Sequence, residues 1–244
     1  MRVLLTLFAS VLLGLTISGA ANAAAEGKRV VVLATSNTNP YIGAWTGTFT
    51  KFAAQAGMKV TNLSANYDAA VQSQQIDDAI AQKYDLIVIC YVNDQAIVPA
   101  LTRAKAAGIP VVLYATPMKK EQEDLWTSYI GTENAELGRF AGEELVKGLA
   151  AEGKTSAKVV AVTGLAQQIN VLARMAAFKA VLAQHPGIQL VATEDGKWNT
   201  AVTEKVTGQL LVRFAGQGGV DGIFAMADNQ ATGAINAVQS AGLN

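Results

Sequence analysis

The chemistry open to this 244-residue chain is limited by its single histidine and its single cysteine. His185 stands in the sequence Gln-His-Pro-Gly, where a surface turn is the expected role rather than general-base catalysis. Cys90 ends an apolar run, and a lone cysteine on a buried strand behaves as a small hydrophobe. The histidines and cysteines of a zinc site are not available, and neither a nucleophile elbow nor a phosphate-binding loop motif is present. We therefore expect a protein that is not an enzyme and that uses no cofactor or metal.

Carboxylate pairs offer the remaining route to catalysis. Asp77-Asp78 and Glu143-Glu144 lie on predicted helices at positions that face solvent, so we interpret them as solvated surface rather than as acid–base pairs. An exported hydrolase stays open as an alternative function, although no motif in the sequence supports it.

Polar and aromatic residues gather at the ends of the predicted strands. They are Ser36 to Tyr41, Asn66-Tyr67, Tyr91 to Asp94 and Tyr114 in the first half, and Gln167 to Asn170, Lys197 to Asn199 and Asp228-Asn229 in the second. Open α/β sheets bind ligands beyond the carboxyl ends of their strands. Rings cover the C–H faces of a small polyhydroxylated molecule while amides and charges bind its hydroxyls. The pattern therefore favours a protein that binds a small molecule.

These residues need a scaffold in which strands alternate with helices. Near-continuous apolar runs predict strands at 29–34, 59–63, 86–90, 110–114, 158–163, 189–193 and 222–225. Helical stretches are predicted at 39–56, 68–82, 95–107, 134–150, 169–184, 200–214 and 229–241. Strands that are apolar on both faces, each followed by a helix, predict parallel and doubly wound sheets.

The alternation is interrupted once, in the polar segment from Pro117 to Ser128, which we interpret as the passage between two lobes. We therefore expect an α/β fold of two Rossmann-like lobes, an amino-terminal lobe at residues 24–131 and a carboxy-terminal lobe at 132–244. The chain stops after Ala241-Gly242, where another strand would be due. The second lobe is therefore expected to be incomplete, with an uncovered sheet edge that lowers stability.

The first 23 residues are typical of a secretory signal peptide. Arg2 supplies the positive charge, and the apolar stretch from Val3 to Ile17 is shorter than a membrane-spanning helix requires. Ala21-Asn22-Ala23 then supplies small residues for cleavage. We expect an exported, soluble periplasmic protein that is cleaved near Ala23 and, because the signal lacks cysteine, carries no lipid.

The charge balance argues against a polyanionic partner. The chain has 19 Lys+Arg and 19 Asp+Glu, whereas nucleic-acid binding requires a dense basic surface. No segment after the signal is apolar enough to span a bilayer. We therefore expect a monomer that binds no nucleic acid and is not embedded in a membrane.

Several landmarks keep a fixed order along the chain. They are Asn39-Pro40-Tyr41, Ala107 to Val112, Ile130 to Asn134 with Gly138, Arg174 with Phe178, Gly222 to Ala225, Asp228 and Ala231 to Ala234. Together they resemble the ribose-binding-like sugar-binding proteins of ABC importers, in the periplasmic binding protein type I family. The resemblance implies a two-lobed clamp that closes on a ligand in the cleft between its lobes and then docks on a membrane permease. It also implies that the final part of the fold is missing.

The resemblance further implies ligand contacts. Asn39 and Tyr41 take the place of first-lobe contacts, Arg174 that of a hydroxyl-binding arginine, and Trp198 that of a ring that stacks on the sugar. The predicted ligand-binding set is completed by Tyr91, Tyr114, Asn170 and Asp228. Three alternatives stay open: Asn39 as a helix cap only, Tyr41 as a core residue, and Arg174 as one half of a surface ion pair.

Three positions depart from the ribose-type pattern. Tyr114-Ala115 replaces an adjacent Asp-Arg pair, Ala227 replaces an asparagine, and Cys90 stands where an amide is common. Hydrogen bonds to charged groups contribute about 1.5–3 kcal/mol each, so we expect ordinary pentose recognition to be lost. Our hypothesis is a ligand with fewer hydroxyls or a larger apolar part, such as a deoxy sugar, a polyol or a sugar-like ring compound.

Two other protein classes share the two-lobe core. Repressors of the lac type do so, but the export signal and the missing amino-terminal helix-turn-helix argue against a repressor. A periplasmic sensor that presents its ligand to a chemoreceptor or kinase uses the same clamp. The sequence does not separate such a sensor from a transport component.

Overall fold

The computed structural model describes residues 25–243, so the predicted signal peptide lies outside the described residues. Contacts along the chain divide it into two compact units. Unit 1 contains the described residues up to Tyr114 together with Lys120–Tyr129, and unit 2 contains Ala115–Lys119 and the residues from Ile130 onward. The lobe limits expected from the sequence, 24–131 and 132–244, stay predictions.

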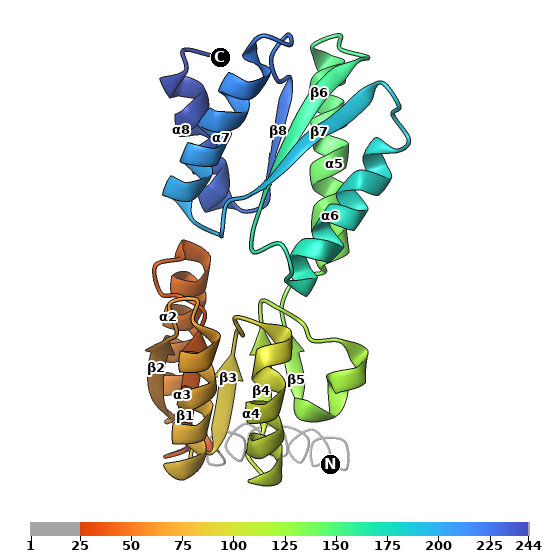
Figure 1. Ribbon diagram of the computed structural model, residues 1–244. Helices are drawn as coiled ribbons and strands as arrows, with labels where there is room; N and C mark the ends of the chain where they lie inside the picture. Colours follow the sequence, from red (N-terminus) through yellow and green to blue (C-terminus); the bar gives the residue numbers. More distant parts are fainter. Residues whose placement is uncertain (1–24, 244) are drawn as a thin grey trace, which may run out of the picture. The chain divides into compact units, whose positions relative to one another are not determined.

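Unit 1 is built on a five-stranded sheet in the order β2-β1-β3-β4-β5 (Figure 1). Its strands are β1 Arg29–Ala34, β2 Lys59–Ser64, β3 Leu86–Ile89, β4 Val111–Tyr114 and β5 Ser128–Ile130. Strand β1 pairs in parallel with β2 and β3, and β3 with β4. The helices are α2 Pro40–Gln55, α3 Ala69–Ala81, α4 Asp94–Ala106 and the 3-10 helix η1 Lys120–Leu125.

Polar side chains begin the helices α2, α3 and α4 of unit 1. Asn39, Asp68 and Asn93 each stand directly before a helix and accept hydrogen bonds from two of its backbone N–H groups. These caps satisfy donors that have no partner inside the helix. Each cap therefore fixes the place where its helix leaves the carboxyl edge of the sheet.

Unit 2 is built on a three-stranded parallel sheet in the order β7-β6-β8. Its strands are β6 Ala157–Thr163, β7 Ile188–Asp195 and β8 Gly222–Ala225. Figure 1 shows α5 Asn134–Ala151 and α6 Ile169–Leu182 on one side of this sheet, and α7 Thr200–Ala215 and α8 Asp228–Ser240 on the other. The first three strands of each unit therefore lie in the same order, 2-1-3 counted along the chain, and we call β1 and β6 the central strands of these three.

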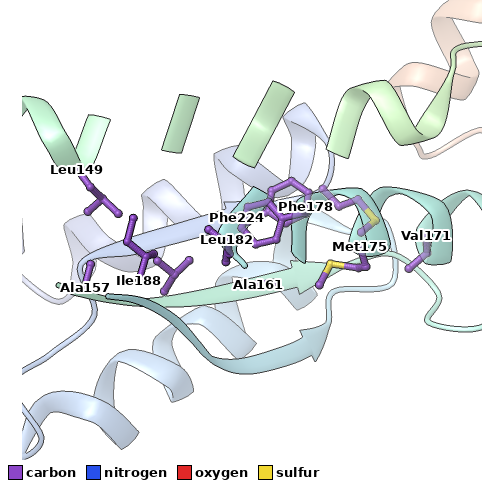
Figure 2. Close-up of a cluster of buried hydrophobic side chains, with 11 residues drawn as sticks. Leu149, Ala157, Ala161, Val171, Met175, Phe178, Leu182, Ile188 and Phe224 are labelled. Carbon is purple, nitrogen blue, oxygen red and sulfur yellow. The ribbon is translucent and has the colours of Figure 1, made fainter. Parts of the chain in front are cut away.

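The larger core of unit 2 lies between its sheet and the helices α5 and α6 (Figure 2). Phe178 of α6 and Phe224 of β8 stack there with their ring centroids 4.3 Å apart. The two helices approach closely at Gly138, where a Cβ atom would lie 2.0 Å from the carbonyl oxygen of Arg174. Gly138 therefore allows α6 to bring Arg174 beside the first turns of α5.

The predicted doubly wound α/β architecture is confirmed, and each predicted strand and helix is present. Strand β5 was missed, because it has only three residues and two of them are exposed, so it carries no apolar run. The segment from Pro117 to Ser128, expected to be an irregular passage, contains η1 and the start of β5. Across residues 25–243, none of the helices combines the length and the apolar character needed to cross a bilayer.

Candidate functional site

Asn39 lies buried at the carboxyl edge of the unit 1 sheet. Its Oδ1 accepts hydrogen bonds from the N–H groups of Tyr41 at 3.0 Å and Ile42 at 3.3 Å. Its Nδ2 donates to the hydroxyl of Tyr67 at 3.5 Å. Asn39 therefore caps α2, one of the two roles that the sequence left open, while its amide nitrogen is directed to a tyrosine.

Tyr41 and Tyr114 differ in exposure. Tyr41 is 50% exposed, which is not the environment of a core residue. Tyr114 is fully buried and stacks on Trp45, with ring centroids 3.9 Å apart and 10° between the planes. Among the described residues its hydroxyl has no hydrogen-bond partner. Burial raises the pKa of Tyr114, with smaller contributions from Cys90 and Tyr41, so the phenol is neutral.

Trp45 was not among the predicted site residues. It lies four residues after Tyr41 and four before Phe49 on α2, and it stacks on Phe49 with centroids 5.3 Å apart. Because side chains four residues apart share one helix face, this aromatic spacing is the signal that could have identified it.

Tyr91 is also fully buried, and a buried glutamine holds its loop. Gln72 donates from Nε2 to the carbonyl of Cys90 at 2.9 Å and accepts at Oε1 from the N–H of Val92 at 2.8 Å. Burial raises the pKa of Tyr91, with smaller contributions from Asp94 and then Cys90. The ring of Tyr91 is thus interior to unit 1, and no sequence pattern had singled out Gln72.

Trp198 of unit 2 is partly exposed and is held by contacts from the loop after β6 and from the first turn of α8. Its Nε1 donates to Oε1 of Gln168 at 2.7 Å, and its carbonyl accepts from Nδ2 of Asn229 at 2.9 Å. The ring covers Gly164, where a Cβ atom would lie 1.9 Å from it. The φ of Trp198 is 56°, in the left-handed region, which costs a residue other than glycine about 1–3 kcal/mol. The surrounding contacts offset this cost and fix the ring.

Arg174 lies beside Trp198, with the guanidinium carbon 5.6 Å from the ring centroid. Its Nε donates to Oδ1 of Asn134 at 2.9 Å, and its Nη1 donates to the carbonyl of Met226 at 2.9 Å. A cation this close to an indole face is attracted by about 0.5–1 kcal/mol. Residues from α5, α6 and the loops after β7 and β8 therefore meet here. We call the two neighbouring side chains the Arg174–Trp198 pair, which Asn134 and Met226 hold in place.

The other two predicted contacts of unit 2 lie at helix starts. Asn170 is only 7% exposed, and its Oδ1 has no hydrogen-bond partner among residues 25–243. An unpaired buried acceptor costs about 1–3 kcal/mol, so a ligand hydroxyl there would be favourable. Asp228 is exposed and is the first residue of α8, where the helix dipole stabilises a carboxylate.

The polar groups near Trp198 are amides, a guanidinium and carbonyls, which bind uncharged polar molecules through hydrogen bonds. In the described part of the chain, no three His, Cys, Asp or Glu side chains are grouped so as to hold a metal ion. This edge of unit 2 is therefore suited to hold a hydroxylated molecule against an aromatic ring.

Residues 30–244 match the family described as periplasmic binding protein domain. The chain is 27% identical to a D-apiose import binding protein of Paraburkholderia graminis, over 93% of this chain and 70% of that protein. It is 28% identical to a ribose import binding protein of Haemophilus influenzae, over 99% of this chain and 78% of that protein.

Solved structures have the same fold. A crystal structure of a galactofuranose binding protein superposes with a TM-score of 0.84 at 22% identity, covering 89% of this chain and 72% of that one. The binding protein of the arabinose ABC transporter from Shewanella sp. ANA-3 gives a TM-score of 0.82 at 24% identity, covering 88% and 70%. At these identities the likeness establishes the fold alone.

Proposed function

The chain belongs to the periplasmic binding protein family, and on this premise we propose that it binds a sugar or sugar-like small molecule and delivers it to the permease of an ABC importer. The family match over residues 30–244, with sugar import binding proteins as relatives, is the observation that carries the proposal. The family and these relatives are binding proteins rather than enzymes. Binding and release therefore require no change in covalent bonds.

In unit 2 we assign recognition to the Arg174–Trp198 pair. The ring stacks on a C–H face of the ligand, and the guanidinium, already oriented by its bonds to Asn134 and Met226, donates to hydroxyls. Asn170 accepts a hydrogen bond from a hydroxyl at its unpaired Oδ1. The carboxylate of Asp228 supplies a further acceptor.

In unit 1 we assign direct contact to Tyr41, because it is half exposed. Asn39 contributes its amide nitrogen, since its oxygen already caps α2. Tyr91 and Tyr114 are fully buried, so their role is to form the surface beneath the ligand. A ligand that contacts both units stabilises the conformation in which both sets of contacts are made.

The ligand we propose has fewer hydroxyls or a larger apolar part than ribose. At the place of the charged Asp-Arg pair of ribose-type proteins, Tyr114 packs under Trp45, and Ala227 offers no side-chain hydrogen bond. Each lost hydrogen bond to a charged group removes about 1.5–3 kcal/mol of ribose affinity. A deoxy sugar, a polyol or a sugar-like ring compound does not need those bonds.

A thermal-shift screen against pentoses, hexoses, deoxy sugars and polyols tests the proposal, because a ligand that binds only the folded state raises the melting temperature. We expect a large shift with one class of compound, confirmed by calorimetric titration. A cooperative melt that no sugar or polyol shifts would exclude sugar binding. Tight binding of unmodified ribose would contradict the proposed ligand class alone.

We propose further that the protein is exported and that its signal peptide is removed after Ala23. Support comes from the short apolar stretch, the small residues before Ala24 and the periplasmic family. Amino-terminal sequencing of protein recovered from the periplasm should begin at Ala24. Recovery of an unprocessed chain in the cytoplasm would contradict this.

A further inference from the structure

The turns that follow β2 and β7, at residues 65–68 and 196–199, are built alike. The first residue of each donates its N–H to the end of the central strand, to the carbonyl of Ala34 at 3.0 Å and of Thr163 at 2.8 Å. The fourth residue of each donates its N–H to the carbonyl of the first at 2.9 Å. That fourth residue then caps the next helix with its side chain. The two turns therefore correspond residue for residue.

The third residue of each turn is aromatic and left-handed, Tyr67 with φ 63° and Trp198 with φ 56°. The second residue is left-handed as well, Asn66 at 49° and Lys197 at 54°. Two successive residues other than glycine adopt this region only when surrounding contacts require it. The shared conformation therefore places Tyr67 and Trp198 at equivalent positions of the two units.

A side-chain amide contacts each of these two aromatic residues. In each unit this amide stands at the start of the helix that follows the central strand. In unit 1, Asn39 donates to the hydroxyl of Tyr67, and in unit 2, Gln168 accepts from the indole of Trp198. Both amides occupy the residue directly before the helix, α2 or α6. Burial raises the pKa of Tyr67, although the bond from Asn39 lowers it, so the ring is a neutral phenol.

We propose that Tyr67 is a ligand-contacting ring of unit 1, the counterpart of Trp198. The inference rests on the proposed function and extends it to a residue outside the predicted ligand-binding set. Tyr67 is partly exposed, unlike the fully buried Tyr91 and Tyr114. A neutral ring held in this way provides an apolar face for the C–H groups of a sugar or polyol.

Calorimetric titration with D-fucose, xylitol and D-ribose tests the role of Tyr67. Tyr67→Leu removes the ring but keeps an apolar side chain, and we expect roughly two- to tenfold weaker binding of the probe that the wild-type chain binds. Tyr67→Phe keeps the ring and should bind within about twofold of wild type, because only the long bond to Asn39 is lost. Phe52→Leu alters an exposed ring on α2 and should bind as wild type does.

A second readout does not depend on the folding of Tyr67→Leu. Wild-type protein labelled with 13C at its tyrosine rings gives a signal for Tyr67, identified by its loss in Tyr67→Phe. We expect this signal to move when the bound probe is added, because the ring lies against the ligand.

The possible failures are distinguishable. If the wild-type chain and Phe52→Leu bind a probe while Tyr67→Leu binds it equally well, Tyr67 is not a contact and the proposed function stands. A Tyr67 signal that stays fixed at saturation leads to the same conclusion. If the folded wild-type chain binds no sugar or polyol, the proposed function fails and the role of Tyr67 fails with it.

Discussion

At the amino ends of their sheets, the two units have the same hydrogen bond between an aspartate and the backbone of a neighbouring strand. Asp85, directly before β3, accepts a hydrogen bond from the N–H of Arg29 at the start of β1, at 2.8 Å. Asp221, directly before β8, accepts from the N–H of Lys158 in β6 at 2.9 Å. Each carboxylate also pairs with a lysine. Both aspartates thus tie a strand to its central neighbour.

At the carboxyl ends, equivalent positions carry different chemistry. Six residues after the helix-capping position stands Trp45 in unit 1 and Arg174 in unit 2. Trp45 stacks on the buried Tyr114, whereas Arg174 lies beside Trp198 and donates two hydrogen bonds. Contacts that hold the sheet together are therefore repeated, while this position at the carboxyl edge carries an aromatic ring in unit 1 and a guanidinium in unit 2.

The caps show the same division. In unit 1, α2, α3 and α4 each begin with a capping side chain, but among the described helices of unit 2 only α7 does, through Asn199. Gln168 and Asn134, at the starts of α6 and α5, instead hold Trp198 and Arg174. Side-chain amides at helix starts thus stabilise helices in unit 1 and orient Trp198 and Arg174 in unit 2.

The stack of Tyr114 on Trp45 in unit 1 should give the largest effect on stability. Tyr114→Ala removes a fully buried ring and its stack on Trp45, so the free energy of unfolding should fall by about 3–5 kcal/mol in denaturant titrations. Tyr41→Ala, which truncates a half-exposed ring, should change it by about 0.5 kcal/mol or less. Similar losses in the two variants would show that the ring of Tyr114 is not a structural element.

Substitution in the Arg174–Trp198 pair of unit 2 should instead weaken ligand binding. Arg174→Met removes hydrogen bonds from a charged donor, so the affinity for the ligand found in the thermal screen should fall by about 1.5–3 kcal/mol. Arg213→Met removes an arginine on α7 that lies near Phe214, outside the Arg174–Trp198 pair, and should leave calorimetric affinity unchanged. An equal affinity for wild type and Arg174→Met would remove Arg174 from the site.

Each helix cap of unit 1 should make a small contribution to the free energy of unfolding. Asn93→Ala removes two hydrogen bonds at the start of α4, and we expect a loss of about 1 kcal/mol in the free energy of unfolding. Asn93→Ser retains a capping oxygen and should recover most of this loss. If serine and alanine destabilise equally, the cap is not the reason for the asparagine.

Asp85 and Asp221, which make equivalent contacts in the two units, should give the smallest effect on stability, and the effect should be the same in each unit. Their bonds lower the pKa of Asp85 and Asp221 below the ordinary 3.8. Because the folded pKa is lowered, the stabilisation is present above the ordinary value and is lost as pH falls through the lowered one. Melting temperatures measured from about pH 2 to pH 7 should therefore depend less on acid pH in Asp85→Asn and in Asp221→Asn. If the acid dependence of the melting temperature changed in only one of the two variants, the two aspartate contacts would not be equivalent.

Much of the fold could be predicted because its signals are local. Asn39-Pro40 marks the start of α2, and Gly57, with a φ of 79°, marks its end. The candidate site was less predictable. Trp198 and Arg174 lie together, but the burial of Tyr91 and Tyr114 and the stack on Trp45 were not foreseen. Tyr67 was predicted to lie at the edge of the sheet but was not in the predicted ligand-binding set.

Local sequence patterns were enough to predict every strand but β5, every helix but η1, and the edge of each sheet that carries polar and aromatic residues. Apolar runs, capping residues and helix-ending glycines act on neighbours along the chain, so they can be interpreted without a fold. Which side chains meet depends on how the elements pack. The bond from Trp198 to Gln168 joins residues 30 positions apart, and it forms because β6 and β7 lie side by side in the sheet. Pairing in a sheet brings distant residues together, and the equivalence of the turns that carry Tyr67 and Trp198 is therefore visible only in the folded chain.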